Sequence, residues 1–356
     1  MPESKALLKS LTDVNGISGH EMQVKSLMKD YLTPVSDDIV EDQLGGIFGK
    51  KNATHGTKSL MISGHLDEIG FIVTQIDEQG YIYFTPIGGW WNQVMLSQKV
   101  TITTESGKEI RGIIGSKPPH ALSSEERKKP VDIKNMYIDI GVRNKEEAKE
   151  AGIELGNMIT PYSESLANDK YLTAKAFDNR YGCALAVEVL QQLKDENIDI
   201  NLYAGATVQE EVGLRGAKVA ANLIKPDLAI AVDVGVAYDV PGMTSEKNEG
   251  KLGDGPLAIL MDATSIAHDG LRKHIKDVAE HHNIPVQWAT TPGGGTDAGS
   301  IHVANEGIPT ITIGVPLRYM HSNVSVLNID DYTNSVRLIT EIVRSLNDDS
   351  YQALMW

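Results

Sequence analysis

The sequence predicts an α/β fold: a mixed, largely parallel sheet covered by helices, with an all-β, barrel-like segment inserted into it. Two patterns predict this arrangement. From residue 169 onward, short apolar runs alternate with helical runs, as in a parallel sheet buried between helices. Between about residues 71 and 160, short strand-like runs follow one another without helices. With 41% hydrophobic and 23% charged residues, the chain can bury the core that such a fold needs.

The α/β part comes from both ends of the chain, so we assign residues 1–70 and 161–356 to one larger domain. Its strands are short and apolar, and its helices carry apolar residues at helical spacing. In chain order the predicted elements are strand 59–63, helix 181–193, strand 202–208, helix 216–224, strands 228–232 and 257–261, helix 270–282, strand 309–315 and helix 329–346.

Residues 71–160 form the predicted insertion. Two short segments with glycine, 77–80 and 105–108, have the composition of hairpin turns. Residues 117–130 contain three prolines and six charged residues, which indicates a loop. The predicted strands of the insertion are 71–77, 81–85, 100–104, 111–115 and 135–140.

Composition and charge exclude several classes of function. The net charge is −15 and no block of Lys and Arg occurs, so nucleic acid is a poor candidate partner. No apolar run approaches the ~20 residues of a membrane span, and residues 1–10 lack the apolar core of a signal peptide. The single cysteine, Cys183, allows no intramolecular disulfide and fits a reducing compartment. We therefore expect a cytoplasmic protein with neither nucleic-acid nor membrane partners.

Histidines and acids stand where predicted elements begin or end. His65 and Asp67 follow the first strand and share a face if that strand continues; the alternative is an exposed strand end. Asp178 precedes the first predicted helix of the C-terminal part, where its carboxylate would equally serve as a helix cap. Taken singly, neither motif decides between a metal site and ordinary structure.

A pair of glutamates carries the stronger signal. Glu210 and Glu211 directly follow an apolar strand, where adjacent buried carboxylates repel each other and lose hydration. A bound cation would remove that cost; the alternative is a pair of solvated glutamates that open a turn. Asp233 ends the next strand, and His321 follows the last one. A lone histidine in such a place is usually structural.

Together these residues place two histidines and several carboxylates at the C-terminal ends of strands, the edge where open α/β sheets bind ligands. A mixture of histidine and carboxylate suits a borderline ion such as zinc or cobalt. One shared carboxylate with two separate sets of ligands would make a two-metal site, with ions ~3.5–4 Å apart, that activates water and polarises an amide carbonyl.

Other motifs give no competing chemistry. The chain lacks G-x-S-x-G, H-E-x-x-H and the P-loop pattern. The run 293–295 of three glycines, before Thr296 and Asp297, is open to two interpretations, an anion-holding loop or a strand-to-helix turn. Cys183 lies beside alanines on a predicted helix, as a packed core thiol does. We expect the pair 90–91 of tryptophans at an edge of the β domain; a binding platform is the alternative.

The chain resembles, nearly end to end, the tetrahedral (TET) aminopeptidase family of clan MH metallopeptidases, which includes glutamyl and deblocking aminopeptidases. Six segments carry the resemblance in order: ISGHLDEIGF, AKAFDNRYG, TVQEEVGLRGA, AVDVG, GGGTDAG and RYMHS. The resemblance implies a zinc-exopeptidase-like catalytic domain and an inserted dimerisation domain. It also implies a homo-oligomer in which six dimers form a hollow dodecamer.

The resemblance further implies two divalent ions per subunit, zinc or cobalt, with manganese as a further choice. His65, Asp178 and Asp233 match the ligands of one ion. Asp178, Glu211 and His321 match those of the other, which makes Asp178 the bridging ligand. All five positions agree with the family pattern.

The same resemblance assigns the remaining roles. Glu210 matches the general base that passes a proton from water to the leaving amine. Asp67 matches the carboxylate that orients a ligand histidine. In related two-metal exopeptidases the bond after the bridging aspartate is cis, so we expect a cis peptide between Asp178 and Asn179.

The expected reaction is removal of N-terminal residues from short peptides. Glutamyl-specific relatives carry a basic residue in the strand after the segment that here reads 253–255. Residues 256–261 contain none, which favours neutral or apolar N-terminal residues; glutamyl specificity is the alternative. More remote alternatives are a deacylase or carboxypeptidase that uses Arg180 or Arg215, a glucanase like some relatives so labelled, and a noncatalytic scaffold.

Overall fold

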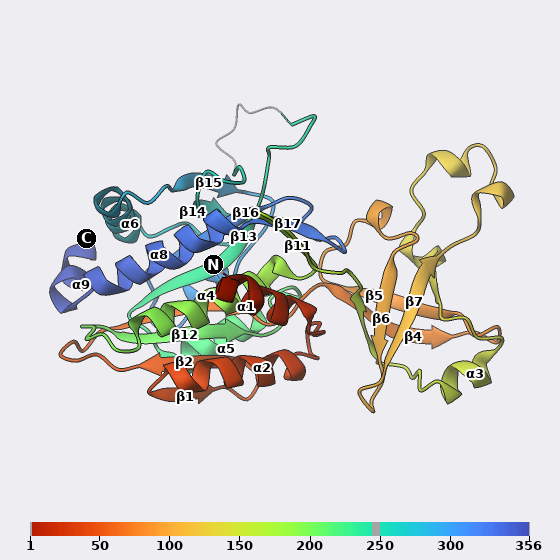
Figure 1. Ribbon diagram of the computed structural model, residues 1–356, viewed down its shortest axis with the longest axis horizontal. Coiled ribbons are helices and arrows are strands. Elements are labelled where there is room, and N and C mark those ends of the chain that lie inside the picture. The colour runs from red at the N-terminus through yellow and green to blue at the C-terminus, as the bar shows by residue number, and fades with distance from the viewer. Residues whose placement is uncertain (1, 244–249, 356) are drawn as a thin grey trace.

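An eight-stranded sheet runs through the larger domain of the computed structural model, which describes residues 2–243 and 250–355 (Figure 1). The strand order is β1-β2-β12-β3-β13-β16-β14-β15. Neighbours β12, β3, β13 and β16 pair in parallel, so their C-terminal ends meet at one edge. The strands are β1 (Asp38–Glu41), β2 (Ile47–Lys51), β3 (Ser59–His65), β12 (Asn201–Thr207), β13 (Leu228–Val236), β14 (Leu257–Asp262), β15 (Gln287–Thr291) and β16 (Thr310–Leu317).

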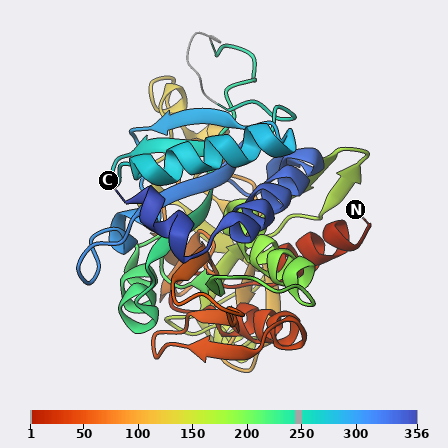
Figure 2. The same cartoon turned by 90° about the vertical axis from the view of Figure 1, so that its left-hand side faces the viewer.

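Helices cover both faces of this sheet, because its strands direct apolar side chains alternately to the two sides (Figures 1 and 2). In β3, Leu60 and Ile62 belong to the core that α1, α2, α4, α6 and α8 cover, whereas Met61 packs with α5 and α7. The helices are α1 (Pro2–Asp13), α2 (Met22–Leu32), α4 (Phe177–Leu193), α5 (Arg215–Ile224), α6 (Asp269–His282), α7 (Ala298–Ile301), α8 (Ile329–Ser345) and α9 (Asp348–Leu354). Within the described residues, no helix is long and apolar enough to cross a membrane.

The insertion is a closed barrel of antiparallel strands that projects from one end of the larger domain (Figure 1). Its order is β4-β5-β8-β7-β6-β9, and a short helix, α3 (Lys145–Glu150), lies between β8 and β9. Phe71, Phe84 and Ile102 are among the buried residues of its separate core. The strands are β4 (Gly70–Ile76), β5 (Ile82–Ile87), β6 (Lys99–Thr103), β7 (Glu109–Gly115), β8 (Tyr137–Asp139) and β9 (Met158–Pro161).

The structure confirms the predicted fold class and the barrel-like insertion. Every predicted strand and helix has a counterpart, with ends shifted by a few residues. Elements without a strong periodic signal were missed, including α1, α2, β1, β2 and β15. A small sheet of β10 (Leu166–Asn168), β11 (Tyr171–Ala174) and β17 (Ser325–Asn328) was also missed, since each strand has only three or four residues.

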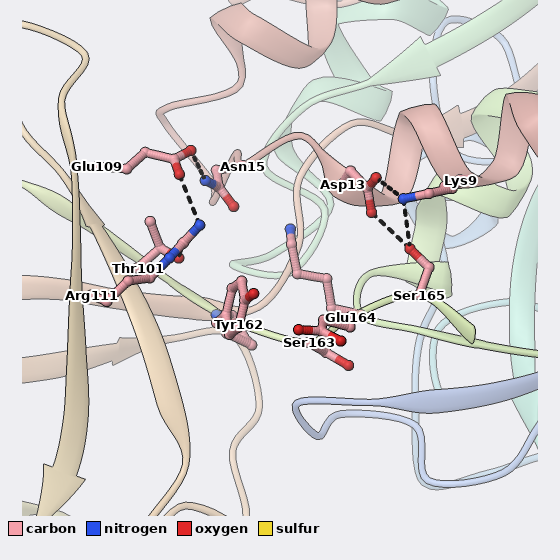
Figure 3. A pocket seen from close by; sticks show the side chains of 12 residues that line it. Lys9, Asp13, Asn15, Thr101, Glu109, Arg111, Tyr162, Ser163, Glu164 and Ser165 are labelled. Atoms are coloured by element: carbon pink, nitrogen blue, oxygen red, sulfur yellow. Dashed lines mark hydrogen bonds and ion pairs between the residues drawn. The ribbon is translucent and has the colours of Figure 1, made fainter.

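A polar seam joins the barrel to the larger domain (Figure 3). The Asn15 side chain donates to Glu109 of β7 at 2.8 Å and accepts from the Thr160 hydroxyl of β9 at 2.8 Å. A cavity of about 400 Å³ opens beside this contact, and several of its charged side chains are paired, as Lys9 is with Asp13 and Arg111 with Glu109. The seam therefore fixes the two domains together and lies apart from the residues predicted for catalysis.

Candidate metal centre

The structure brings all seven predicted site residues to the edge where the parallel strands end. His65 is the last residue of β3, and Asp233 lies within β13, which runs beyond the predicted end. The two glutamates, Glu210 and Glu211, follow β12. The remaining three residues are Asp178 in the first turn of α4, Asp67 in the loop after β3, and His321 in the loop after β16.

Asp178 stands at the centre of the cluster. Its Oδ1 lies 3.2 Å from Nε2 of His65, and its Oδ2 lies 3.2 Å from Nε2 of His321. The helix-cap interpretation is wrong, because Asp178 makes no capping bond and instead faces the histidines. Asn179 fills that role, since its Oδ1 accepts from the Gly182 amide at 3.0 Å. The bond between Asp178 and Asn179 is cis, as predicted.

His65 is held from behind by the loop that follows it. Its ring is 1% exposed, and Nδ1 lies 3.0 Å from the main-chain oxygen of Asp67 and 3.5 Å from that residue's Oδ1. The Asp67 carboxylate accepts from the Ser18 hydroxyl at 2.6 Å and from the amides of Glu210 and Glu211 at 3.1 and 3.2 Å. Asp67 therefore orients the histidine mainly through its backbone, while its side chain fixes the glutamate pair.

His321 is the more exposed of the two histidines, with 34% of its side chain accessible. Its Nε2 also lies 3.5 Å from Oε2 of Glu211. Burial lowers the pKa of this ring, but Asp178, Glu211 and the backbone of Gly89 outweigh burial and bring the pKa to about 9. The backbone of Gly89 lies against this ring, since a Cβ atom on Gly89 would be 2.9 Å from Nδ1 of His321. Gly89 belongs to the β domain, and sequence reasoning missed it.

The acids around this centre are crowded and poorly hydrated. Burial, reinforced by Asp178, raises the pKa of Glu211 to about 8 and that of Asp233 well above its usual range. Burial also raises the pKa of Glu210 well above that range. Burial opposes ionisation of Asp178 too, but the two histidines outweigh it and lower its pKa. One buried oxygen of Glu211, Oε1, has no hydrogen-bond partner. A cation would satisfy that oxygen and relieve the repulsion, so these residues fit a metal centre.

Three sets of ligand atoms lie close enough to hold an ion, each within 4.8 Å. Two of them coincide with the sets that the resemblance implies. The third combines His65 with both glutamates, because Oε2 of Glu210 is 3.8 Å from that histidine. The sets are His65 with Asp178 and Asp233, His65 with Glu210 and Glu211, and Asp178 with Glu211 and His321.

A cavity of about 740 Å³ opens in front of the cluster. Beyond the acids, its wall includes the apolar side chains of Leu214, Val236 and Met320. Residues 293–295 also line it, so the glycine run is part of the site as a turn before the four-residue α7. Among the described residues that line the cavity, none is Lys or Arg.

Three other residues considered in the sequence analysis make their contacts within the protein. Arg180 is fully buried and donates to main-chain oxygens, among them that of Leu66 at 2.7 Å, and to Glu68. It is therefore not free to bind a substrate carboxylate, and the exposed Arg215 bonds Gln209 instead. Cys183 is a packed thiol, as predicted: it is fully buried, and burial raises its pKa to about 11.

An α/β sheet with two histidines and four carboxylates at the C-terminal edge of its parallel strands has the make-up of a metallohydrolase centre. The chain belongs to the M42 glutamyl aminopeptidase family, whose model matches residues 45–338. It is thus a hydrolase of a metallo-aminopeptidase family, as the sequence resemblance predicts.

Curated relatives match over nearly their whole length. The chain is 39% identical to the putative aminopeptidase FrvX of Escherichia coli, covering 98% of this chain and 97% of that protein. It is 37% identical to the glutamyl aminopeptidase of Lactococcus lactis, with 96% of each covered. A lysyl aminopeptidase of Pyrococcus furiosus is 32% identical, again with 96% of each covered.

Solved structures agree with this family over the whole fold. A TET aminopeptidase from a marine sediment archaeon of the Thaumarchaeota superposes with a TM-score of 0.96 at 38% identity, with 100% of both chains covered. The Pyrococcus horikoshii TET1 peptidase, which can assemble into a tetrahedron or a large octahedral shell, gives a TM-score of 0.86 at 30% identity. That match covers 96% of this chain and 100% of the other.

Proposed function

We propose that this M42 aminopeptidase removes single N-terminal residues from short peptides with the help of two divalent metal ions. One observation carries the proposal: the two oxygens of Asp178 each lie 3.2 Å from a different histidine, as a bridging ligand requires. His65 and Asp233 complete one set of ligands, and Glu211 and His321 complete the other. When bound, such ions supply an activated water and polarise the carbonyl of the scissile amide.

Glu210 is the group we assign to proton transfer. It lines the cavity with 9% of its surface exposed, and its backbone amide is held by Asp67. Burial raises the pKa of Glu210 well above its usual range, which suits a group that first accepts a proton from water and then gives it to the leaving amine. The third possible ligand set would instead make Glu210 a ligand, and metal analysis of its variants distinguishes the two.

We propose a preference for neutral or apolar N-terminal residues. A charged substrate side chain needs an opposite charge when it is desolvated, and the described lining offers only the acids of the metal centre and His321. Residues 257–261 of β14, on which the sequence argument rested, do not line the cavity; Thr264, beyond that strand, does. Arg318 is paired with Asp239 at 2.5 Å and is not part of the lining.

The test is a comparison of kcat/KM for leucyl, alanyl, glutamyl and lysyl nitroanilides with one metal present. We expect leucine or alanine to be preferred by about tenfold or more. A glutamyl substrate that exceeds leucine tenfold would restore the glutamyl alternative, and a lysyl one would align the chain with its P. furiosus relative. N-acyl amino acids and a soluble glucan in the same panel test the deacylase and glucanase alternatives.

The choice of metal and the assembly complete the proposal. After chelation, zinc, cobalt and manganese are added back singly, and we expect zinc or cobalt to restore turnover best.

We propose a homo-oligomer of dimers joined through the β domain, up to a dodecamer, supported by the shell-forming P. horikoshii relative. A monomer in light scattering at micromolar concentration would contradict this. A cytoplasmic location is proposed from the single, buried cysteine.

A further inference from the structure

The loop after β5 leaves the barrel and reaches the metal centre. Gly89 lines the cavity together with Asp178 and His321. A Cβ atom on Gly89 would lie 2.9 Å from Nδ1 of His321, and one on Gly88 would lie 3.0 Å from Oε2 of Glu211. Real Cβ atoms rarely make contacts this short, so the backbone of this loop packs directly against two of the proposed ligands.

We propose that Gly89 is a positioning residue for the metal centre: its backbone fixes the His321 ring, so that the β domain helps to build one of the two ion positions. This inference rests on the proposed function only for the identity of the ligands. Metal-binding histidines generally hold their second nitrogen against a carbonyl or carboxylate, which sets the ring's orientation. His65 has such a partner in the main chain of Asp67, and the geometry gives Gly89 the same part at His321.

His321 needs an outside support more than His65 does. Its loop has two left-handed residues, Tyr319 and His321, with φ of 63° and 56°. Its side chain is 34% exposed, against 1% for His65. The ring is therefore not enclosed by the catalytic domain alone, and contact with Gly89 restricts it on the side away from Asp178.

The barrel holds the supporting loop firmly. Trp90 stacks on Phe71, with ring centroids 4.5 Å apart, and its Nε1 donates to the carbonyl of Gly70 at 3.0 Å. The side chain of Asn92 donates to Val131 at 2.8 Å. The loop thus belongs to the barrel, and the seam at Asn15 sets how close it comes to His321.

The first test is Gly89→Ala in the full-length protein, titrated with Co²⁺ after chelation and followed by visible absorbance and calorimetry. The added methyl group displaces the His321 ring, so we expect one ion to bind as in the wild type and the other about 10- to 100-fold more weakly. Gly107→Ala is the control: it lies in a hairpin turn of the same domain at φ 79° with nothing within 4 Å of its Cβ. This control should bind both ions normally.

A second pair of variants removes the risk that Gly89→Ala fails to fold. Trp90→Phe loses the hydrogen bond to Gly70 but keeps the stacked ring, and Trp91→Phe changes a neighbour that is 59% exposed. We expect only Trp90→Phe to weaken the second ion, by less than Gly89→Ala does. Normal affinity for both ions in Gly89→Ala, or equal weakening of both, would overturn the inference.

The outcomes separate this inference from the proposed function. A wild-type protein that binds two ions but hydrolyses no aminoacyl substrate defeats the proposed function and leaves the Gly89 comparison intact. Active wild-type protein whose Co²⁺ titration is unchanged by Gly89→Ala defeats the inference alone. A wild type that binds one ion, with affinity unaffected by both Gly89→Ala and His321→Ala, defeats the two-ion centre and the inference together.

Discussion

His65 and His321 face different oxygens of the same carboxylate, yet different parts of the molecule hold them. His65 is buried and bonded to the main chain of Asp67, two residues further on. His321 is partly exposed and faces Gly89 of the β domain. The orientation of the His65 ring is therefore set by the chain next to it, whereas that of the His321 ring depends on how the two domains are placed against each other.

A buried cluster of charged side chains lies next to the loop that follows His65. Glu68 accepts from Lys175 at 2.6 Å and from Arg180 at 3.3 Å, and all three are almost fully buried. Lys175 and Arg180 flank Asp178 in sequence, while Glu68 follows the loop of His65. Because removing one partner of such a cluster typically costs ~3–5 kcal/mol, these contacts hold the segment of Asp178 against the loop that follows His65.

The largest expected effect comes from the ligand that the two positions share. Asp178→Ala should lose both ions and with them nearly all turnover, because each histidine loses its carboxylate neighbour. The measurement is metal content after dialysis, with kcat/KM for a leucyl nitroanilide. Asp233→Ala is the matched control and should disturb only the position of His65. If Asp178→Ala keeps one ion at wild-type affinity, Asp178 does not bridge.

Substitutions at the two adjacent glutamates should separate an effect on turnover from an effect on metal binding. Glu210→Gln removes the proposed base but keeps the size of the side chain, so turnover should fall ~10²–10⁴-fold while metal content stays near that of the wild type. Glu211→Gln, one residue on, should weaken the ion at His321 instead. Loss of an ion from Glu210→Gln would show that the third ligand set is the correct one.

Sequence patterns singled out the residues that the structure brings together, because each lies at or near the end of a regular element. An apolar run followed by paired acids, as at Glu210 and Glu211, places two carboxylates where hydration is poor, and a bound cation is one way to relieve their repulsion. Asp178 was harder, because a cap and a ligand occupy the same place before a helix. The neighbouring Asn179 resolves this by making the capping bond itself.

The remaining parts of the site could not be predicted from local patterns. Gly89 reaches His321 only because a separately folded barrel sits against the sheet edge, and nothing near Gly89 in the sequence signals a metal. Part of the wall of the cavity likewise comes from loops, such as that of Thr264, whose direction depends on tertiary packing. The sequence argument for specificity used strand β14 because glutamyl-specific relatives carry a basic residue there, yet residues 257–261 do not line the cavity.

The affinity for the ion at Glu211 and His321 should depend on pH. Without metal, Glu211 and His321 have pKa values of about 8 and 9, so both are protonated at pH 7 and must lose protons to bind an ion. Affinity should therefore rise with pH, by at least about tenfold between pH 6.5 and 7.5. Calorimetry with Co²⁺ in two buffers of different ionisation enthalpy checks this, since proton release changes the observed heat. Equal affinities at the two pH values would contradict the proposed ligation.

The smallest effect is expected at Cys183, which contacts the main chain of His65. Its Sγ donates to the main-chain oxygen of His65 at 3.2 Å, and burial raises its pKa to about 11, so it is a neutral thiol at working pH. Cys183→Ala deletes this weak bond, but Asp67 still holds the ring. We expect stability to fall by ~1 kcal/mol, with kcat/KM within about threefold of the wild type. Cys183→Ser, which keeps a donor, is the comparison. A loss of about a hundredfold or more in both variants, with fold and metal content intact, would instead make the thiol part of the reaction and place the chemistry on the His65 side of the centre.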